Sequence, residues 1–95
     1  MAQVTFDGTV IAEGQAVEKM EGRRYFPRQD VDTSVLEPST TAYTCPWKGA
    51  AQYYHVRIGE RRIVDGAWSY PDAKPAARAI AGHLAFDVRA GLEVT

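Results

Sequence analysis

Apolar and polar residues alternate in short runs along most of the chain, and a turn signal ends almost every run. Such alternation is typical of half-buried β-strands rather than of helices. Two runs flank Asp7-Gly8, and two more flank the turn signal Glu21-Gly22. The four predicted strands span residues 4–6, 10–12, 17–20 and 24–26. The first part of the chain is therefore expected to form two β-hairpins.

The clearest run is Ala50–Ile58, whose alternate residues fall on opposite faces of a strand. Gly59-Glu60 follows as a two-residue turn, in which Gly59 supplies the positive φ of a type II′ hairpin. Residues 61–68 then return antiparallel. The register pairs Val56 with Ile63, Tyr54 with Asp65 and Arg57 with Arg62. Because the last pair brings two like charges together, a longer loop that shifts the register is an alternative.

The pattern between these hairpins is weaker. Residues 30–36 are predicted as an irregular segment with one helical turn, which Asp32 or Thr33 would cap. Residues 37–40, rich in turn formers, are predicted as a loop. A short strand at 42–45 follows, and Pro46 ends it.

One helix is predicted, from Pro75 to about Leu84, because apolar residues recur there at helical spacing and Pro75 suits a first turn. Residues 92–95 are predicted as a last short strand. The expected fold is α+β and mainly antiparallel, a small bent or barrel-like sheet with one C-terminal helix. At 95 residues, we expect a single domain over 1–95.

Charge and cysteine content narrow the classes of function. The chain has 11 basic and 12 acidic residues, a formal net charge of -1, so nothing predicts binding to nucleic acid or a membrane surface. No apolar run approaches the roughly 18 residues of a membrane span, and the start lacks a signal-peptide pattern. One cysteine permits no internal disulfide and, with two histidines, is too few ligands for a structural zinc site. We expect a soluble cytoplasmic protein with no cofactor and no metal.

Three clusters place aromatic rings beside a proline and a chemically active side chain. They are Tyr25-Phe26-Pro27-Arg28-Gln29-Asp30-Val31, Thr44-Cys45-Pro46-Trp47-Lys48-Gly49 and Ala67-Trp68-Ser69-Tyr70-Pro71. Aromatic walls with a few convergent polar groups are typical of small-molecule pockets. The clusters therefore predict a ligand site, without identifying the ligand.

The same clusters carry a family resemblance. Phe6-Asp7-Gly8-x-x-Ile11-Ala12 precedes them and Ile80-Ala81-Gly82-His83-Leu84-Ala85-Phe86 follows them. In order and spacing, over nearly the whole chain, this sequence resembles domain-of-unknown-function family 427, which also carries a nucleotidyltransferase label. The resemblance implies a compact, mainly antiparallel domain of the β-tent kind, with a concavity lined by these motifs, and no established activity. Gly14, Ala73 and Asp87 depart from the family pattern.

Cys45 is the candidate nucleophile, and Lys48 is the candidate cation that would favour its thiolate form. His55 or His83 would serve as the base of a nucleophile–base pair. The alternative is structural, since a free cysteine is among the most buried residue types.

Arg28 and Asp30 lie two positions apart, so they share a face in an extended segment. They are interpreted as an anion clamp, in which Asp30 orients Arg28, or as an ion pair that holds the loop after Pro27. Asp30-Val31-Asp32 also resembles the D-x-D metal pair of nucleotidyl transfer. That chemistry needs a further acid, and Asp32 is equally suited to cap a helical turn.

Two functional hypotheses follow. The first is a domain that binds a small, anionic or aromatic molecule in a concave pocket, with Cys45 as a route to catalysis. Its predicted pocket residues are Tyr25, Arg28, Asp30, Cys45, Lys48, Trp68 and Tyr70. The second is a protein-interaction or homodimeric module, in which the aromatic clusters form the core. Nucleotidyl transfer is the least favoured activity.

Overall fold

The computed structural model describes residues 1–15, 18–89 and 91–95. Within these ranges the chain forms β-strands joined by turns and three short 3-10 helices. The strands are β1 (Ala2–Phe6), β2 (Thr9–Gly14), β3 (Glu18–Met20), β4 (Arg23–Tyr25), β5 (Leu36–Cys45), β6 (Gly49–Ile58), β7 (Arg61–Ser69), β8 (Leu84–Phe86) and β9 (Leu92–Val94). The helices are η1 (Arg28–Asp30), η2 (Thr33–Val35) and η3 (Pro75–Ile80). No helix among the described residues has the length and apolar content needed to cross a membrane.

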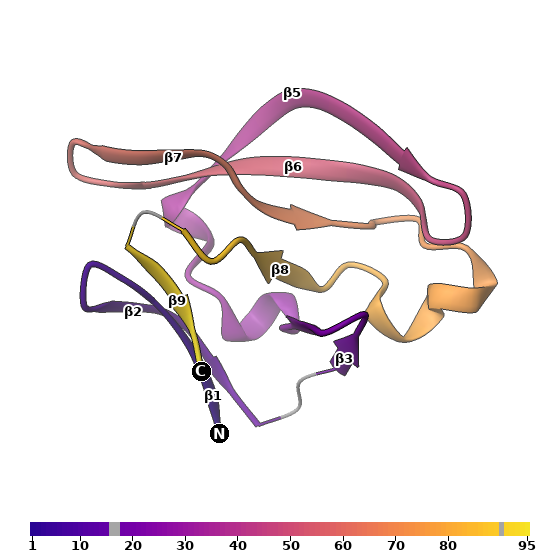
Figure 1. The fold of residues 1–95 in the computed structure, drawn as a ribbon, viewed down its shortest axis with the longest axis horizontal. Coiled ribbons are helices and arrows are strands. Elements are labelled where there is room, and N and C mark those ends of the chain that lie inside the picture. The colour runs from indigo at the N-terminus through magenta and orange to yellow at the C-terminus, as the bar shows by residue number, and fades with distance from the viewer. Residues whose placement is uncertain (16–17, 90) are drawn as a thin grey trace.

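The strands form three antiparallel sheets, with the orders β2-β1-β9, β3-β4 and β5-β6-β7-β8 (Figure 1). The expectation of a mainly antiparallel fold is confirmed. The expectation of one bent or barrel-like sheet is corrected, because the strands form three open sheets.

The main apolar core lies between the four-stranded sheet and the sheet of β1, β2 and β9. Its fully buried members include Val4, Phe6, Val56, Ala67 and Leu84. Alternate residues of β6 and β7 face this core, so the intervening residues of those strands face the other way. That second face of the four-stranded sheet is where the site described below lies.

Both predicted N-terminal hairpins are present. Asp7 and Gly8 turn β1 into β2 with φ of 49° and 87°, and Glu21 and Gly22 turn β3 into β4 with φ of 53° and 79°. Two consecutive positive φ values match the type I′ turn, whose twist suits a tight hairpin. Of the predicted strand 17–20, Val17 lies outside the described residues.

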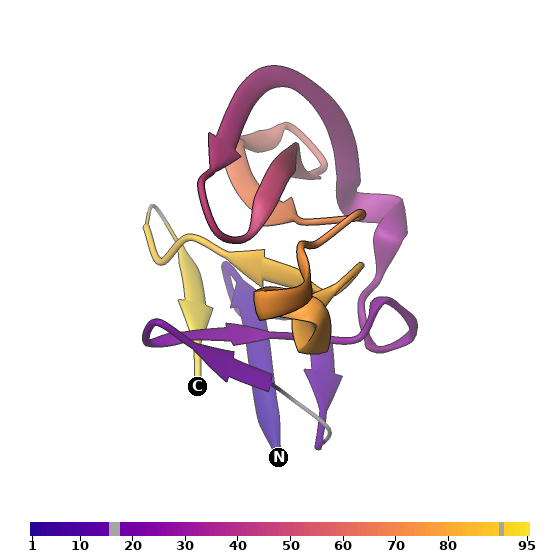
Figure 2. The ribbon, with the colours of Figure 1, turned by 90° about the vertical axis from the view of Figure 1, so that its right-hand side faces the viewer.

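Residues 37–40 are part of β5 rather than the predicted loop. Leu36, Glu37 and Pro38 pair with Val56, His55 and Tyr54 of β6, and the pairing is irregular from Pro38 to Ala42. β5 is an edge strand, where a proline needs no partner for its missing N–H group. The irregularity lets β5 bend through the wide arc seen in Figure 2.

The predicted C-terminal helix is wrong. Residues Pro75–Ile80 form a 3-10 helix with a kink at Ala77, and no helix of the described residues is longer. Gly82, at φ 73°, turns the chain so that Leu84 exchanges two backbone hydrogen bonds of 2.8 Å with Phe26. The apolar residues Ala77, Ile80 and Leu84 are still fully buried. Ala81, the fourth member of the predicted apolar stripe, is exposed, so the spacing marked the buried side only in part. Tertiary pairing decided the conformation of the segment.

The β6–β7 register is partly as predicted. Val56 pairs with Ile63 and Arg57 with Arg62, and Gly59 has the positive φ expected of its turn. Glu37 on β5 hydrogen-bonds Arg57 at 3.2 Å and Arg62 at 3.1 Å, which compensates the like-charge pair. The predicted Tyr54–Asp65 pair is wrong.

A register shift in β7 explains that error. Tyr54 pairs with Ala67, because the register moves between Tyr54 and Val56 of β6. Asp65 has a φ of 53°, which takes it out of the extended conformation. The shift places Trp68 opposite Tyr53.

Candidate functional site

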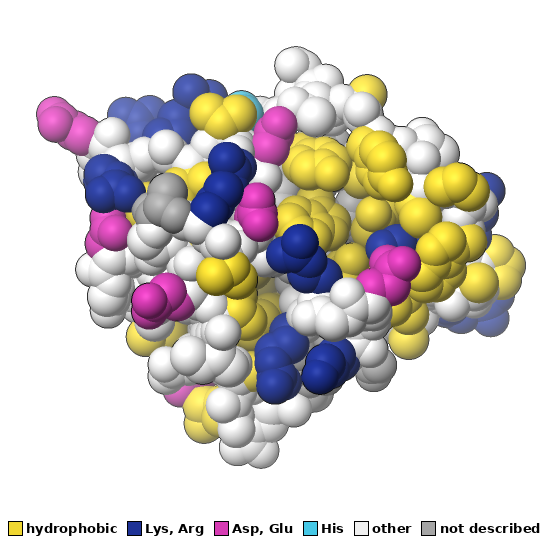
Figure 3. All heavy atoms as spheres, in the orientation of Figure 1, with side chains coloured by type: hydrophobic (Ala, Val, Ile, Leu, Met, Phe, Trp, Pro, Cys, Tyr) yellow, Lys and Arg dark blue, Asp and Glu magenta, His cyan; other side chains and the backbone are white. Residues whose placement is uncertain are grey.

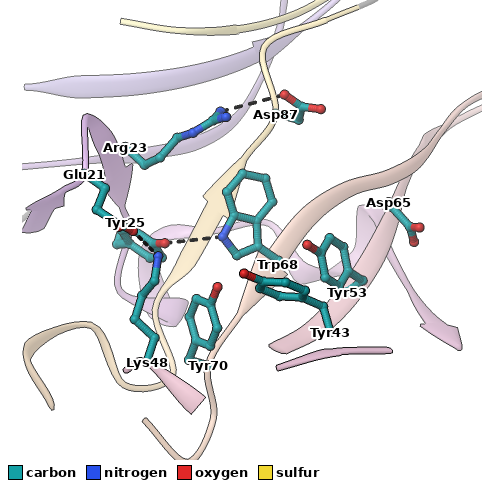
Figure 4. A pocket seen from close by; sticks show the side chains of 10 residues that line it. All are labelled: Glu21, Arg23, Tyr25, Tyr43, Lys48, Tyr53, Asp65, Trp68, Tyr70 and Asp87. Carbon is teal, nitrogen blue, oxygen red and sulfur yellow. Dashed lines mark hydrogen bonds and ion pairs between the residues drawn. The ribbon is translucent and has the colours of Figure 1, made fainter. Parts of the chain in front are cut away.

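A cavity of about 400 Å³ lies on the second face of the four-stranded sheet, beside the β3–β4 hairpin. In Figure 3, hydrophobic side chains gather on the right-hand half of the molecule, with basic and acidic side chains among them. Figure 4 shows the cavity from close by. Its lining residues are Glu21, Arg23, Tyr25, Tyr43, Lys48, Tyr53, Asp65, Trp68, Tyr70 and Asp87.

Tyr43, Tyr53 and Trp68 form the aromatic wall of the cavity. Tyr53 and Trp68 are cross-strand partners, with ring centroids 6.2 Å apart and planes inclined by 35°. Tyr43 pairs with Ala51, which is two residues before Tyr53 and therefore on the same face. Tyr43 is 49% exposed, so this wall is open to solvent on one side.

Three polar tips face the cavity from side chains that are otherwise almost wholly buried. Tyr25, Tyr70 and Lys48 are 1%, 3% and 8% exposed. The indole N–H of Trp68 donates to the Tyr25 hydroxyl over 3.3 Å, which leaves the Tyr25 O–H free to donate elsewhere. In the described part of the chain, the Tyr70 hydroxyl has no hydrogen-bond partner. Figure 4 shows these tips directed into one space.

Lys48 owes its position to the β5–β6 turn. Gly49 has a φ of 111°, a conformation that L side chains rarely adopt, and a Cβ there would lie 3.3 Å from the Asp72 carbonyl oxygen. The Lys74 backbone N–H donates to the Lys48 carbonyl over 2.9 Å, and Lys74 Nζ donates to the Pro46 carbonyl over 2.8 Å. The turn is thus fixed from both sides.

The ammonium of Lys48 contacts one carboxylate and two rings. Nζ forms an ion pair with Glu21 Oε1, and it lies 5.3 Å from the ring centroid of Tyr70 and 5.2 Å from that of Trp47. Burial acts to lower the pKa of Lys48, but the hydrogen bond to Glu21 and the nearby tyrosines outweigh it, so the pKa is raised. Burial raises the pKa of Tyr70 to about 12, although the charge of Lys48 acts against this. At neutral pH the site therefore holds a charged ammonium and a neutral Tyr70 hydroxyl.

A second charged group borders the opposite side of Trp68. The Arg23 guanidinium lies 5.2 Å from the Trp68 ring centroid, and its Nη1 lies 3.7 Å from Asp87 Oδ1. Asp87 also pairs with Arg89 at 3.0 Å. One carboxylate therefore lies beside two guanidinium groups, and it is nearer to Arg89 than to Arg23.

Asp65 lies at the edge of the cavity, and its hydrogen bonds are made to neighbouring strands. Its Oδ2 accepts from Thr41 Oγ1 over 2.6 Å, and its backbone N–H donates to His55 Nδ1 over 3.0 Å. Since Nδ1 of His55 accepts this bond, it carries no proton, and the Asp65 carboxylate 3.7 Å away is no ion-pair partner in this state. Among described side chains, Asp65 Oδ1 is the buried polar atom that lacks a hydrogen bond.

The structure brings Tyr25, Lys48, Trp68 and Tyr70 together but leaves Arg28 and Asp30 apart from them. The Arg28 guanidinium lies 6.0 Å from the Tyr54 ring centroid, and Arg28 is not part of the cavity lining. The Asp30 carboxylate occupies the space where a side chain at position 14 would lie. The predicted clamp and the predicted aromatic pocket are therefore separate places, and the binding roles of these residues stay predictions.

Cys45 is 5% exposed and lies outside the cavity lining. It packs in a small buried cluster with Tyr25, Tyr70 and Ile80. The thiol of Cys45 is therefore not accessible from the cavity. The catalytic role of Cys45 and Lys48 stays a prediction.

Asp32 caps the helix η2, which is one of the two roles predicted for it. Its Oδ1 accepts from the Ser34 backbone N–H over 3.1 Å and from the Ser34 hydroxyl over 2.5 Å. Over 1–15, 18–89 and 91–95, no three acidic, histidine or cysteine side chains gather in a way that could hold a metal ion.

The sequence matches the family described as Domain of unknown function (DUF427) over residues 1–94. The chain belongs to the DUF427 family. The predicted resemblance is therefore confirmed, and the description of DUF427 assigns no activity. The comparison with curated proteins gave no match.

Six lining residues of this DUF427 member escaped the sequence-based prediction. They are Glu21, Arg23, Tyr43, Tyr53, Asp65 and Asp87. Strand alternation could have found Tyr53, which lies on the face of β6 opposite Tyr54. No local signal marks Glu21, which is 27 residues from Lys48 and meets it only because a hairpin folds over the sheet.

Proposed function

We propose that the cavity binds a small molecule that combines a flat ring with an anionic group. The observation that carries this proposal is the convergence of the Lys48 ammonium and the Tyr25 and Tyr70 hydroxyls on one cavity beside the Trp68 and Tyr53 rings. Aromatic walls with a few placed polar groups are the usual composition of small-molecule sites. At about 400 Å³, the volume also lies within the usual range for such sites.

Most polar groups that remain unpaired at the cavity are donors, and the exception is Asp65 Oδ1 at its edge. Glu21 is paired with Lys48, and Asp87 is paired with Arg23 and Arg89. An ammonium has three N–H donors, of which Glu21 takes one. Donors on Lys48, Tyr25 and Tyr70 suit an acceptor-rich, negatively charged group.

The ring of the ligand would lie against Trp68 and Tyr53. Offset or edge contacts between aromatic rings add about 0.5–1.5 kcal/mol beyond the burial of apolar area. Trp68 is half-buried and already contacts Arg23 on one side and Tyr53 on another, so its orientation is fixed.

The test uses 1-naphthoate and its neutral analogue 1-naphthamide, followed through the NMR signal of the Trp68 indole N–H group. Both probes are expected to shift this signal, and naphthoate should bind more tightly. Lys48→Met should weaken naphthoate by roughly tenfold, the range of a lost charged hydrogen bond, and leave naphthamide nearly unchanged. Lys19→Met is the matched control, since Lys19 is an exposed lysine outside the lining.

Failure of both probes to bind would count against a small-molecule site. Sedimentation of the same sample would then address the alternative of a homodimeric or protein-interaction module, since a stable dimer would favour it. An equal loss of naphthoate binding in Lys19→Met and Lys48→Met would mean that only the net charge matters.

A further inference from the structure

Glu21 already places a carboxylate where the proposed ligand would place its anionic group. Its Oε1 pairs with Lys48 Nζ beside the Tyr25 and Tyr70 side chains. The two partners differ in environment, because the Lys48 side chain is 10% exposed and the Glu21 side chain is 50% exposed. The ammonium is thus a fixed part of the site, and the carboxylate reaches it from the surface.

The β3–β4 hairpin carries Glu21 at the first position of its turn. In Figure 4, Glu21 extends from this hairpin toward the Lys48 tip, across the side of the cavity that Tyr25 borders. Glu21 could leave Lys48 by rotation of its own side chain, since no other hydrogen bond of the described residues holds its carboxylate.

We propose that Glu21 is a built-in competitor, and that the physiological ligand is a ring-bearing monocarboxylate whose carboxylate replaces that of Glu21 on Lys48. This inference rests on the proposed function. The exchange keeps the charge of the site unchanged, because one carboxylate leaves the ammonium as another arrives. The released Glu21 side chain turns into water, and it has little further to go because it is already half-exposed.

The donor set favours a carboxylate over a phosphate. One ammonium and two neutral hydroxyls match a single negative charge with two acceptor oxygens. A phosphate monoester, with close to two negative charges at pH 7, would require a second cation beside Lys48, and the other basic lining residue, Arg23, lies against the Trp68 ring and Asp87 instead.

Removing the competitor should strengthen binding of the charged probe alone. A ligand that must displace an internal group can bind only the fraction of sites from which that group has left. Its apparent affinity is the intrinsic affinity multiplied by this fraction. For a partly exposed pair worth up to about 1 kcal/mol, Glu21→Gln should tighten 1-naphthoate by about fivefold. The affinity for 1-naphthamide should not change, because that probe has no charge to exchange.

The experiment measures both probes, with 1-naphthyl phosphate as a third, against the wild-type chain, Glu21→Gln and Glu60→Gln. Glu60 lies in the β6–β7 turn, outside the cavity lining, so its variant controls for a change of net charge. Tighter naphthoate binding in Glu21→Gln alone supports the inference.

Other outcomes separate the two proposals. If naphthoate and naphthamide bind the wild-type chain and Glu21→Gln changes neither, Glu21 is no competitor, while the small-molecule site stands. If naphthyl phosphate binds more tightly than naphthoate, the assignment to carboxylates is wrong. If no probe binds any of the three proteins, both the inference and the proposed function fail.

Discussion

The Tyr70 hydroxyl retains its proton far into alkaline solution. Burial is the main reason that its pKa rises to about 12, from an ordinary value of 10. The folded chain therefore binds this proton more tightly than the unfolded chain does. The stability that results is complete below pH 10 and is lost as the pH rises through 12. The pKa of Lys48 is also raised, so its contribution has the same sign.

Tyr70→Phe tests this directly. At pH 7 we expect the free energy of unfolding to change by less than about 1 kcal/mol, because no hydrogen bond of the described residues uses this hydroxyl. Between pH 9 and 11.5 the wild-type chain should lose roughly 2 kcal/mol more than the variant. Urea denaturation at several pH values measures this difference. Parallel alkaline losses in both proteins would show that Tyr70 titrates normally.

The thiol of Cys45 should be protected from reagents. Its 5% exposure and its packing against Tyr25 and Tyr70 leave iodoacetamide little access in the folded state. We expect native-state alkylation at pH 8 to be slower by about a hundredfold or more than in urea, the factor set by a few kcal/mol of local opening. Rapid alkylation of the folded protein, followed by mass spectrometry, would instead support the predicted nucleophile.

The irregular point in β7 is the element on which the aromatic wall depends. Asp65 leaves the extended conformation, with its N–H group bound to His55 and its carboxylate bound to Thr41. Trp68 consequently pairs with Tyr53. Burial alone would raise the pKa of Asp65, but the neighbouring Ser39 and Thr41 side chains hold it below its ordinary value of 3.8.

Two substitutions at position 65 separate backbone strain from charge. Asp65→Val should lower the free energy of unfolding by roughly 2–4 kcal/mol, because a β-branched residue is strained at φ 53° and the bond to Thr41 is lost. Asp65→Asn should cost less than about 1 kcal/mol, since Asn tolerates this conformation and keeps an acceptor.

The loss of stability at acid pH provides a second measurement on the same variants. The folded-state pKa of Asp65 is depressed, so its stabilisation is present above the ordinary value of 3.8 and is lost as the pH falls through the folded-state value. Asp65→Asn should lack this part of the acid loss. Equal stability of the Val and Asn variants at pH 7 would mean that the conformation at position 65 is not strained.

Across the whole molecule, the sequence predicted strands better than it predicted how they meet. Turn chemistry located both N-terminal hairpins, and alternation located β6. The helix at 75–84 failed because Ala77 and Ile80, three residues apart, also share a face in a short 3-10 helix. The pairing of Leu84 with Phe26 then favours a strand. Residues 37–40 were predicted as a loop because they contain Pro38, and nothing in the local sequence shows that β5 is an edge strand, where a proline is tolerated.

The candidate site shows the same limit. The clusters around Tyr25, Lys48 and Trp68 were correctly singled out, and they meet at one cavity. Arg28 has the right chemistry and lies only three residues from Tyr25, yet Pro27 and η1 carry it away from that cavity. Glu21 was missed because its role arises from contact across the fold, which no spacing in the sequence encodes.

The sheets differ in how firmly they are held, and this difference bears on the exchange proposed for Glu21. β6 is paired on both sides, by β5 and β7, whereas β3 and β4 are joined to each other by three residue pairs and, among the described residues, to β8 by the single bridge between Phe26 and Leu84. Two-stranded hairpins are marginally stable on their own. We therefore expect amide hydrogen exchange in β3–β4 to require several kcal/mol less than in β6, whose amides should exchange by global unfolding.

Glu21→Gln links that difference to the site. If the ion pair with Lys48 helps to hold the hairpin down, the variant should lose up to about 1 kcal/mol of protection in β3–β4, and β6 should change less. Glu60→Gln, which alters a different turn, should leave the hydrogen-exchange protection of β3–β4 unchanged.

Saturating 1-naphthoate should increase the hydrogen-exchange protection of β6 and β7 in the wild-type chain. The same ligand should decrease the protection of β3–β4, because it takes Lys48 from Glu21. A uniform gain in protection across all three sheets would contradict the exchange of carboxylates, even if the probe binds.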